Sequence, residues 1–225
     1  MNENVTPHGI HFIKRHFRVV AMLCALFSST FNLSGCLGSL SNVPAPDYFQ
    51  IDYPFQSSKC VEPFPGTLRV WPFSASTPFD HEQMFVTSPS LRVRFSSHYK
   101  WVSSAGDMIT SHLMRDLSIG NIFQSIIPAG DPMPAAYGMS GQVYRFALEE
   151  GSSSRVLLEI EISFWREKPH AILFRKYFHY QSPPLTSTDP GEFAAAMSDL
   201  VSQLSTDLRN DLCTITQDSL HQAAD

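Results

Sequence analysis

The chain has 225 residues, 43% of them hydrophobic and 16% charged, and a formal net charge of −5. This negative balance disfavours recognition of nucleic acid, whose phosphates attract basic surfaces. The hydrophobic fraction supports a packed core, and the length suits one domain of ordinary size.

The N-terminus has the pattern of a secretory signal that ends in a lipobox. Residues 1–18 carry three basic residues and one acid, and Val19–Phe31 is apolar apart from Ser28–Thr30. This run is shorter than the roughly 20 residues of a transmembrane helix, but it fits the apolar region of a signal peptide. Leu33–Cys36 (LSGC) follows, with two small residues before the cysteine. We therefore predict cleavage just before Cys36.

Cys36 is the predicted lipid attachment site. Its thiol would carry a diacylglycerol and its amine an acyl chain such as palmitate, and two or more chains hold a protein stably on a membrane. The alternative is an ordinary secretory signal with an incidental cysteine. The residue directly after the cysteine is Leu37 and not an aspartate. Resemblance to enterobacterial-type lipoproteins then implies sorting to the outer membrane of a Gram-negative bacterium, facing the periplasm.

The composition divides the chain into four parts. Residues 1–35 form the signal peptide, 36–46 the lipidated N-terminus and a tether, 47–216 the folded domain and 217–225 a polar tail. The tether is small, polar and proline-containing, as linkers are. Residues 36–225 carry 13 basic and 20 acidic side chains. Attachment to a membrane is therefore expected to depend on the lipid and not on net charge.

The first half of the domain is predicted to form strands. Short apolar or alternating runs mark them at four places: 48–53, 67–73, 82–87 and 91–95. In the last run, Leu91, Val93 and Phe95 alternate with Arg92 and Arg94. A period of two with one polar face indicates a strand that is solvated on that face.

The second half contains both helix and strand patterns. A helical period predicts a first helix over 104–119, ended by Gly120. A loop rich in Pro, Gly and Ala follows at 128–138. Alternating patterns then predict three strands, at 140–148, 156–165 and 171–180. The short polar turns between these strands suit an antiparallel meander.

A second helix is predicted to begin at Asp189, which can cap it. Pro190 fits the first helical position, and Glu192 is placed to complete a capping box. Its apolar side chains recur three and four residues apart: Phe193, Met197, Leu200, Val201, Leu204, Leu208 and Leu212. Such a stripe packs on a sheet. We expect a single α/β domain of the α+β kind, with a mixed, mostly antiparallel sheet and two amphipathic helices on one face.

Two cysteines remain after processing, because Cys24 leaves with the signal peptide and Cys36 is lipidated. Cys60 and Cys213 would then meet in an oxidising compartment, with no CxxC or His-rich neighbour to suggest metal binding. We predict a disulfide between them. The alternative is that Cys213, next to the apolar stripe, is a small buried side chain with a free thiol.

No sequence motif predicts catalysis, a metal site or a cofactor. His81-Glu82 resembles the start of a zinc-protease motif, but position 85 is Phe85, so the second histidine is missing. A glycine-rich phosphate loop and a Gly-x-Ser-x-Gly elbow are also absent from the sequence. We therefore predict that the protein is not an enzyme.

Aromatic residues at two places are candidates for a partner surface. Tyr99 and Trp101 end a predicted strand just before the first helix, and Trp165 ends the middle strand of the meander. Packing in the core is the alternative reading for all three. The sequence does not separate a contact surface from a core for such residues.

Several motifs follow one another in a fixed order: the lipobox at Cys36, Tyr48–Ile51 (YFQI), Val70–Phe73 (VWPF), Met84–Thr87 (MFVT), Leu91–Trp101, and the strand and helix over 174–212. In this order they resemble the ABC-type transport auxiliary lipoprotein family. These are the paraquat-inducible C-like components that accompany lipid transporters with mammalian-cell-entry domains. The resemblance covers nearly all of the mature chain and implies a domain without catalytic residues.

The resemblance also implies a function and partners. The protein would be an outer-membrane-anchored auxiliary lipoprotein that docks a periplasmic mammalian-cell-entry protein, which works with an ABC permease and ATPase. Two other classes stay open: an outer-membrane assembly lipoprotein of the lipopolysaccharide-assembly type, and a lipid-anchored periplasmic hydrolase. Association with further copies of the same chain is also open.

Overall fold

The computed structural model describes residues 44–56, 60, 63–88, 90 and 92–222, with side chains as far as Ile215. Residues 45–225 cluster as one unit. The described chain holds nine strands, β1 (Asp47–Phe49), β2 (Phe64–Val70), β3 (Ser74–Ala75), β4 (Gln83–Thr87), β5 (Val93–Trp101), β6 (Phe123–Pro128), β7 (Tyr137–Glu149), β8 (Arg155–Arg166) and β9 (Ala171–Gln181). Its two helices are α2 (Ala105–Ile119) and α3 (Pro190–Gln222). The predicted signal peptide and Cys36 lie outside the described residues.

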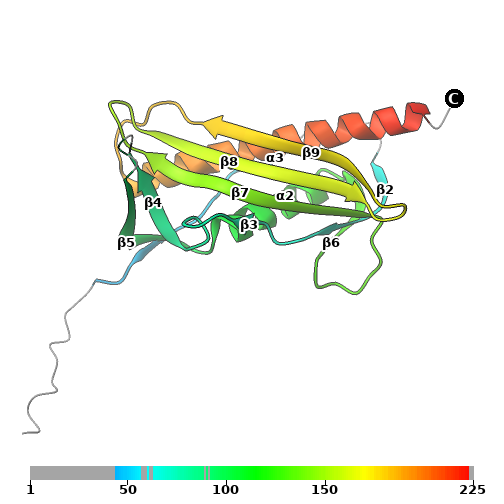
Figure 1. The fold of residues 1–225 in the computed structure, drawn as a ribbon, viewed down its shortest axis with the longest axis horizontal. Coiled ribbons are helices and arrows are strands. Elements are labelled where there is room, and N and C mark those ends of the chain that lie inside the picture. The colour runs from blue at the N-terminus through cyan, green and yellow to red at the C-terminus, as the bar shows by residue number, and fades with distance from the viewer. Residues whose placement is uncertain (1–43, 57–59, 61–62, 89, 91, 223–225) are drawn as a thin grey trace, which may run out of the picture. The chain divides into compact units, whose positions relative to one another are not determined.

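One long strand, β7, organises the sheet. It pairs antiparallel with β8, and β8 pairs antiparallel with β9, which confirms the predicted meander. On its other edge β7 pairs in parallel with β2 at Tyr137–Met139, with β3 at Gln142–Val143 and with β4 at Leu148–Glu149. The sheet is therefore mixed. β4, β5 and β1 lie toward one end of β7, and β2 and β6 toward the other (Figure 1).

The middle strand of the meander explains why the sheet has a buried face. The apolar side chains of β8 that alternate along the strand are fully buried: Val156, Leu158, Ile160, Ile162 and Phe164. Glu159, Glu161 and Ser163 point to the opposite face and are only half-buried. This alternating row places most of the large apolar groups of β8 on the side that the helices cover.

Both helices cover the same face of the sheet, as expected (Figure 1). α2 contacts β3, β6 and β7, whereas α3 contacts β1, β8 and β9, and the two helices touch each other. The predicted apolar stripe of α3 is buried along its whole length, from Phe193 to Leu212. The helix extends past residue 216, into the segment that we expected to be a polar tail.

The helix starts follow the sequence signals with one change. Ser104 caps α2 by accepting a hydrogen bond from the Asp107 amide at 3.2 Å. Asp189 caps α3 by accepting one from the Gly191 amide at 2.8 Å. The expected capping box is not completed, because the Glu192 carboxylate turns outward to the preceding loop. There it accepts hydrogen bonds from the backbone amides and hydroxyls of Thr186 and Ser187.

The sheet differs from the sequence-based expectation in several places. β2 begins and ends three residues earlier than expected, β3 was not expected, and β5 extends to Trp101. The first strand is shorter than residues 48–53, since only Asp47–Phe49 pair with a neighbour, β5. β6 was not expected, because Phe123–Pro128 lacks an alternating pattern. β7 begins at Tyr137, inside the stretch predicted to be a loop, because Leu68–Val70 pairs with its first residues.

A disulfide in the structure connects the start of the domain to its last helix. Cys60 precedes β2 and Cys213 lies on α3, and their Cα atoms are 5.2 Å apart. This separation is within the range that a disulfide spans. The bridge encloses most of the domain, with a sequence separation of 153 residues.

We predict that this disulfide forms in the exported protein and stabilises it. Replacing Cys213 by Ser should lower the free energy of unfolding by roughly 2–5 kcal/mol, because the unfolded chain loses a long-range constraint. Mass spectrometry of the non-reduced, alkylated protein should show neither cysteine modified. Two alkylated thiols in freshly exported protein would contradict the prediction.

A second prediction concerns acid stability and Glu192. Hydrogen bonds from the Ser187 hydroxyl and the Thr186 amide lower the pKa of Glu192 from 4.5 to about 2. The folded state therefore prefers the ionised carboxylate. Its hydrogen bonds stabilise the fold fully above about pH 4.5, and this stabilisation is lost as the pH falls toward about 2.

Glu192→Gln should therefore lower the melting temperature at pH 7. The difference from the wild type should shrink as the pH falls from about 4.5 to about 2. Thermal unfolding followed by circular dichroism across this range checks the prediction. Asp199→Asn, at an exposed position on the same helix, is the matched control. A difference that stays constant with pH would rule out the proposed role of the carboxylate.

Candidate functional site

The segment that follows the predicted tether contacts both helices. We call residues 45–56 the N-terminal strap. Ile51 and Tyr53 are buried while their neighbours Asp52 and Pro54 are exposed. This alternation resembles a strand, but these side chains pack against helices and not in a sheet. The Asp52 amide also donates a hydrogen bond to the hydroxyl of Ser198 on α3, at 3.1 Å.

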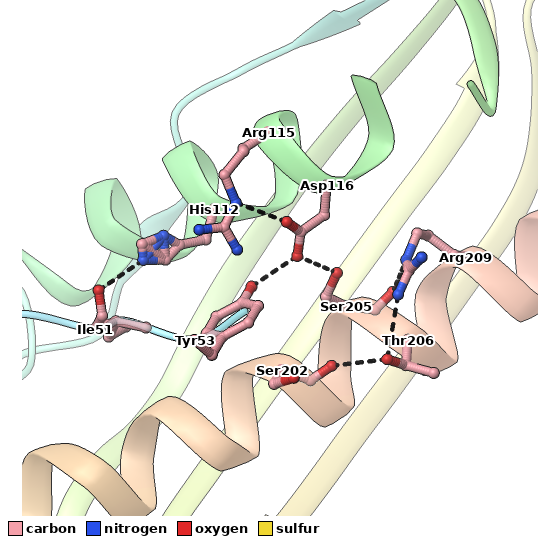
Figure 2. A network of polar contacts seen from close by, with 9 residues as sticks. All are labelled: Ile51, Tyr53, His112, Arg115, Asp116, Ser202, Ser205, Thr206 and Arg209. Atoms are coloured by element: carbon pink, nitrogen blue, oxygen red, sulfur yellow. Dashed lines mark hydrogen bonds and ion pairs between the residues drawn. The ribbon is translucent and has the colours of Figure 1, made fainter. Parts of the chain in front are cut away.

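A buried carboxylate, Asp116 of α2, is the centre of a polar network that includes the strap (Figure 2). Its Oδ2 accepts hydrogen bonds from the Tyr53 hydroxyl at 2.9 Å and from the Ser205 hydroxyl at 2.6 Å. Its Oδ1 accepts one from Arg115 Nε at 2.7 Å. Asp116 is 1% exposed, so these three donors replace the water that a free carboxylate would bind. They come from the strap, α3 and α2.

The rings of His112 and Tyr53 lie where the strap meets this network. His112 Nε2 donates a hydrogen bond to the carbonyl oxygen of Ile51 at 2.8 Å, and the His112 and Tyr53 rings meet edge to face. The Arg115 guanidinium lies 4.7 Å from the centre of the Tyr53 ring. Burial lowers the pKa of His112, which favours its neutral form. Burial also raises the pKa of Tyr53, and Asp116 raises it further, so the hydroxyl stays protonated and donates.

A second cation, Arg209 of α3, lies beside the carboxylate and is 1% exposed. Its Nε donates to the Ser205 carbonyl at 3.2 Å and its Nη2 to the Thr206 hydroxyl at 3.3 Å. The guanidinium stacks 4.7 Å from the centre of the Phe55 ring, a cation–π contact that compensates part of its burial. Its Nη1 has no hydrogen-bond partner within the described part of the chain.

The arrangement holds chain segments together and does not resemble a reaction centre. Both oxygens of Asp116 are occupied, and the residue is closed to solvent, so it cannot act as a base toward an incoming substrate. Within residues 44–56, 60, 63–88, 90 and 92–222 there is also no group of three His, Cys, Asp or Glu that could hold a metal ion. In the same range, neither helix is long and apolar enough to cross a membrane.

Of the two readings that the sequence left open for Trp101, the structure supports packing in the core and not a partner surface. Trp101 is 1% exposed, and its indole meets the rings of Phe146 and Phe193 edge to face, at 5.1 and 5.4 Å between centres. It is therefore a core residue that joins β5, β7 and α3. The pairing of β5 with β4 is irregular between Phe95 and Lys100, and of the residues of β5 only the last, Trp101, is buried.

The other two aromatics of the predicted surface lie at different ends of the domain. Tyr99 is 38% exposed and meets Phe49 of β1 edge to face. Trp165 is half-buried and lies flat against Gly138, where an added Cβ would come within 2.3 Å of its ring. Gly138 is at the start of β7, whereas β4 and β5 are at its far end. The structure does not bring Tyr99 and Trp165 together.

The network residues Asp116, Ser205 and Arg209 were missed by sequence reasoning, although a signal existed. Asp116 falls directly before Leu117 in the apolar row of α2. Ser205 and Arg209 follow Val201 at helical spacing in the buried row of α3. A charged side chain in an apolar row must find a partner. The sequence does not identify that partner.

Comparison with protein families decides what kind of protein this is. A model of the family described as ABC-type transport auxiliary lipoprotein component matches residues 56–208. The chain belongs to this family. The match includes Asp116 and Ser205, and it leaves the strap residues 45–55 and Arg209 outside its range.

Solved structures share the fold of this auxiliary lipoprotein. The structure of protein XCC0632 from Xanthomonas campestris matches with a TM-score of 0.68 at 16% identity, over 78% of this chain and 99% of that one. A structure described only as an uncharacterized protein matches with a TM-score of 0.59 at 12% identity, over 75% and 99%. At such identities the likeness shows the fold alone. A search of curated proteins found no match.

The polar network predicts which substitutions destabilise this auxiliary lipoprotein. Asp116→Asn should lower the free energy of unfolding by about 3–5 kcal/mol, because it removes a buried charge that accepts three hydrogen bonds and turns an amide donor toward groups that are themselves donors. Tyr53→Phe should cost less, roughly 1.5–3 kcal/mol, since it removes one hydrogen bond to a charged group. Urea denaturation followed by circular dichroism checks both values. Asp199→Asn is the exposed control, and an Asp116→Asn variant as stable as this control would contradict the prediction.

Proposed function

We propose that this protein is the outer-membrane-anchored, periplasm-facing subunit of an ABC lipid transport system that contains a mammalian-cell-entry protein. It acts by docking that protein and tethering it to the membrane, without turning over a substrate of its own. The family match over residues 56–208 is the observation that carries the proposal. The lipobox at Cys36 supports the anchor, and Leu37 supports the outer membrane.

The structure supports a tethering role through the way the strap is held. The tether Leu37–Pro46 has ten residues, which reach about 33–36 Å at most. β1 pairs with β5 over only three residues, which alone would peel easily. Beyond β1, the hydrogen bonds of Ile51, Asp52 and Tyr53 fasten the strap to both helices. A pull on the lipid anchor is thus transmitted to the core of the domain.

The absence of turnover is part of the same proposal. The buried acid Asp116 is enclosed by its donors, and its role in the structure is to accept hydrogen bonds. The described tyrosines with altered pKa values, such as Tyr53 and Tyr180, are shifted upward and so away from reactivity at neutral pH. A domain that holds a partner in place needs a rigid scaffold and an anchor, and it needs no activated nucleophile.

Purification from membranes tests the anchor and the partner together. Wild-type protein extracted in mild detergent should co-purify with a mammalian-cell-entry protein and its permease and ATPase, identified by mass spectrometry. Cys36→Ser should leave carbonate-washed membranes at least tenfold more than the wild type, because it lacks the acyl chains. Asp199→Asn should behave like the wild type in both measurements.

Three results would overturn the proposal. The first is a Cys36→Ser protein that stays on washed membranes. The second is recovery of a β-barrel assembly complex in place of the transporter, which favours an assembly lipoprotein. The third is hydrolysis of lipid esters that is lost on changing one side chain, which favours an enzyme.

A further inference from the structure

Strand β5 leaves its apolar face uncovered. The sequence alternates apolar and basic residues here, a pattern that predicts one buried face. In the structure, however, Val93 is 48% exposed and Phe95 is 67% exposed, like the polar residues between them. Phe95 touches only the edge of the core, with its ring 6.3 Å from that of Phe85. No other element of the described chain covers this row.

Exposed apolar side chains gather around this strand. Ten large hydrophobic residues in the described chain are exposed, and five of them lie on β1, on β5 or directly after it: Tyr48, Val93, Phe95, Tyr99 and Val102. We call these five the β5 patch. β1 and β5 are paired, and the Val102 amide donates to the Phe49 carbonyl at 2.9 Å, so the patch belongs to one continuous part of the fold. Figure 1 shows β5 at one end of the sheet.

Basic side chains are interleaved with the patch. Arg92, Arg94, His98 and Lys100 alternate with its apolar residues along the strand. Arg94 pairs with Glu150, and Arg92 and Lys100 add local positive charge to a chain whose overall charge is negative. Aromatic and aliphatic tips combined with long cationic side chains are the composition of membrane interfaces. The aliphatic stems and rings reach into the headgroup layer while the charges meet lipid phosphates.

The patch also lies close to the point where the anchor joins the domain. Asp47–Phe49 pairs with Tyr99–Trp101, so β5 is directly beside the first strand after the tether. Nine residues separate Cys36 from Pro46, and they span about 33 Å at most. A lipid on Cys36 therefore keeps β5 within a few nanometres of the bilayer surface.

We propose that the β5 patch rests on the phospholipid surface of the bilayer that holds the Cys36 lipid. The contact is shallow, because the outer edge of Val93–Phe95 pairs with no strand of the described chain, and backbone groups at such an edge need the water of the headgroup region. The proposal rests on lipidation of Cys36, which is part of the proposed function. It adds an orientation: β5 faces the membrane, and the opposite end of β7 faces the periplasm.

Depth measurement on the full lipidated chain tests the orientation. Phe95→Cys and Ile172→Cys, at positions 67% and 57% exposed, are each labelled with an environment-sensitive fluorophore. Position 172 is far from β4, as its pairing shows: Ile172 pairs with Trp165, and Trp165 pairs with Gly138. Gly138 lies ten residues along β7 from Leu148, which pairs with β4, so the two ends are about 33 Å apart. Labelling without reductant spares the bridged Cys60 and Cys213, and mock-labelled wild type gives the background.

The labelled proteins are reconstituted in phosphatidylethanolamine–phosphatidylglycerol vesicles that carry headgroup nitroxide lipids. The label at position 95 should be quenched at least threefold more than the label at position 172. Adding Val93→Ser and Tyr99→Ser should reduce this ratio toward one, with circular dichroism to confirm folding. The matched pair Tyr144→Ser and Tyr177→Ser, which replaces two exposed aromatics elsewhere, should leave the ratio unchanged.

Two outcomes overturn the proposal. A label at position 95 as weakly quenched as that at position 172 means that the patch does not touch the bilayer. A label shielded in proportion to the protein-to-lipid ratio, but not quenched by the nitroxide, means that a second copy covers the patch. These vesicles hold no transporter, so the result is independent of whether a mammalian-cell-entry partner co-purifies.

Discussion

The buried carboxylate of Asp116 is the constraint on which the arrangement of this domain depends. A buried anion without donors is costly, so the folded state must supply them. They come from three separate parts of the chain: Tyr53 of the strap, Arg115 of α2 and Ser205 of α3. The strap and the two helices must therefore be placed so that their donors all reach the Asp116 carboxylate. Side chains that pack by shape alone would allow the strap more than one position on the helices.

The sheet gives this assembly two ends with different chemistry. At one end of β7, Trp165 lies against Gly138 and next to Trp71, and both indole rings are half-buried. At the other end, β5 leaves the apolar side chains of Val93 and Phe95 exposed. Under the proposed function, the protein contacts a membrane with one surface and a transport complex with another. Because β7 is long, it keeps the surfaces at its two ends apart within one element.

The sequence predicts well the elements that have a regular apolar period. It predicts poorly the residues whose surroundings depend on contacts far along the chain. The meander and the helices follow from their apolar periods, because each buries its own stripe on one face. The strap has the same alternation as a strand, and only tertiary contacts show that Ile51 and Tyr53 pack on helices. Trp101 and Phe95 lie on the same strand, yet one is core and the other exposed, and the pairing of β5 with β4 is irregular between them. Asp116 was recognisable as an exception in an apolar row, but its partner Ser205 is 89 residues away.

The bridge between Cys60 and Cys213 has a consequence for the order in which the protein is made. The proposed export would deliver the N-terminus first and Cys213, Arg209 and Ser205 among the last residues. Until these arrive, Asp116 lacks its donor from α3, and α2 is the only helix to which the strap can bind. Contacts of such long sequence separation form slowly compared with local ones. Under the proposed export, the domain would complete its fold only after almost all of the chain has crossed the membrane, whereas Cys36 would be available for lipidation from the start.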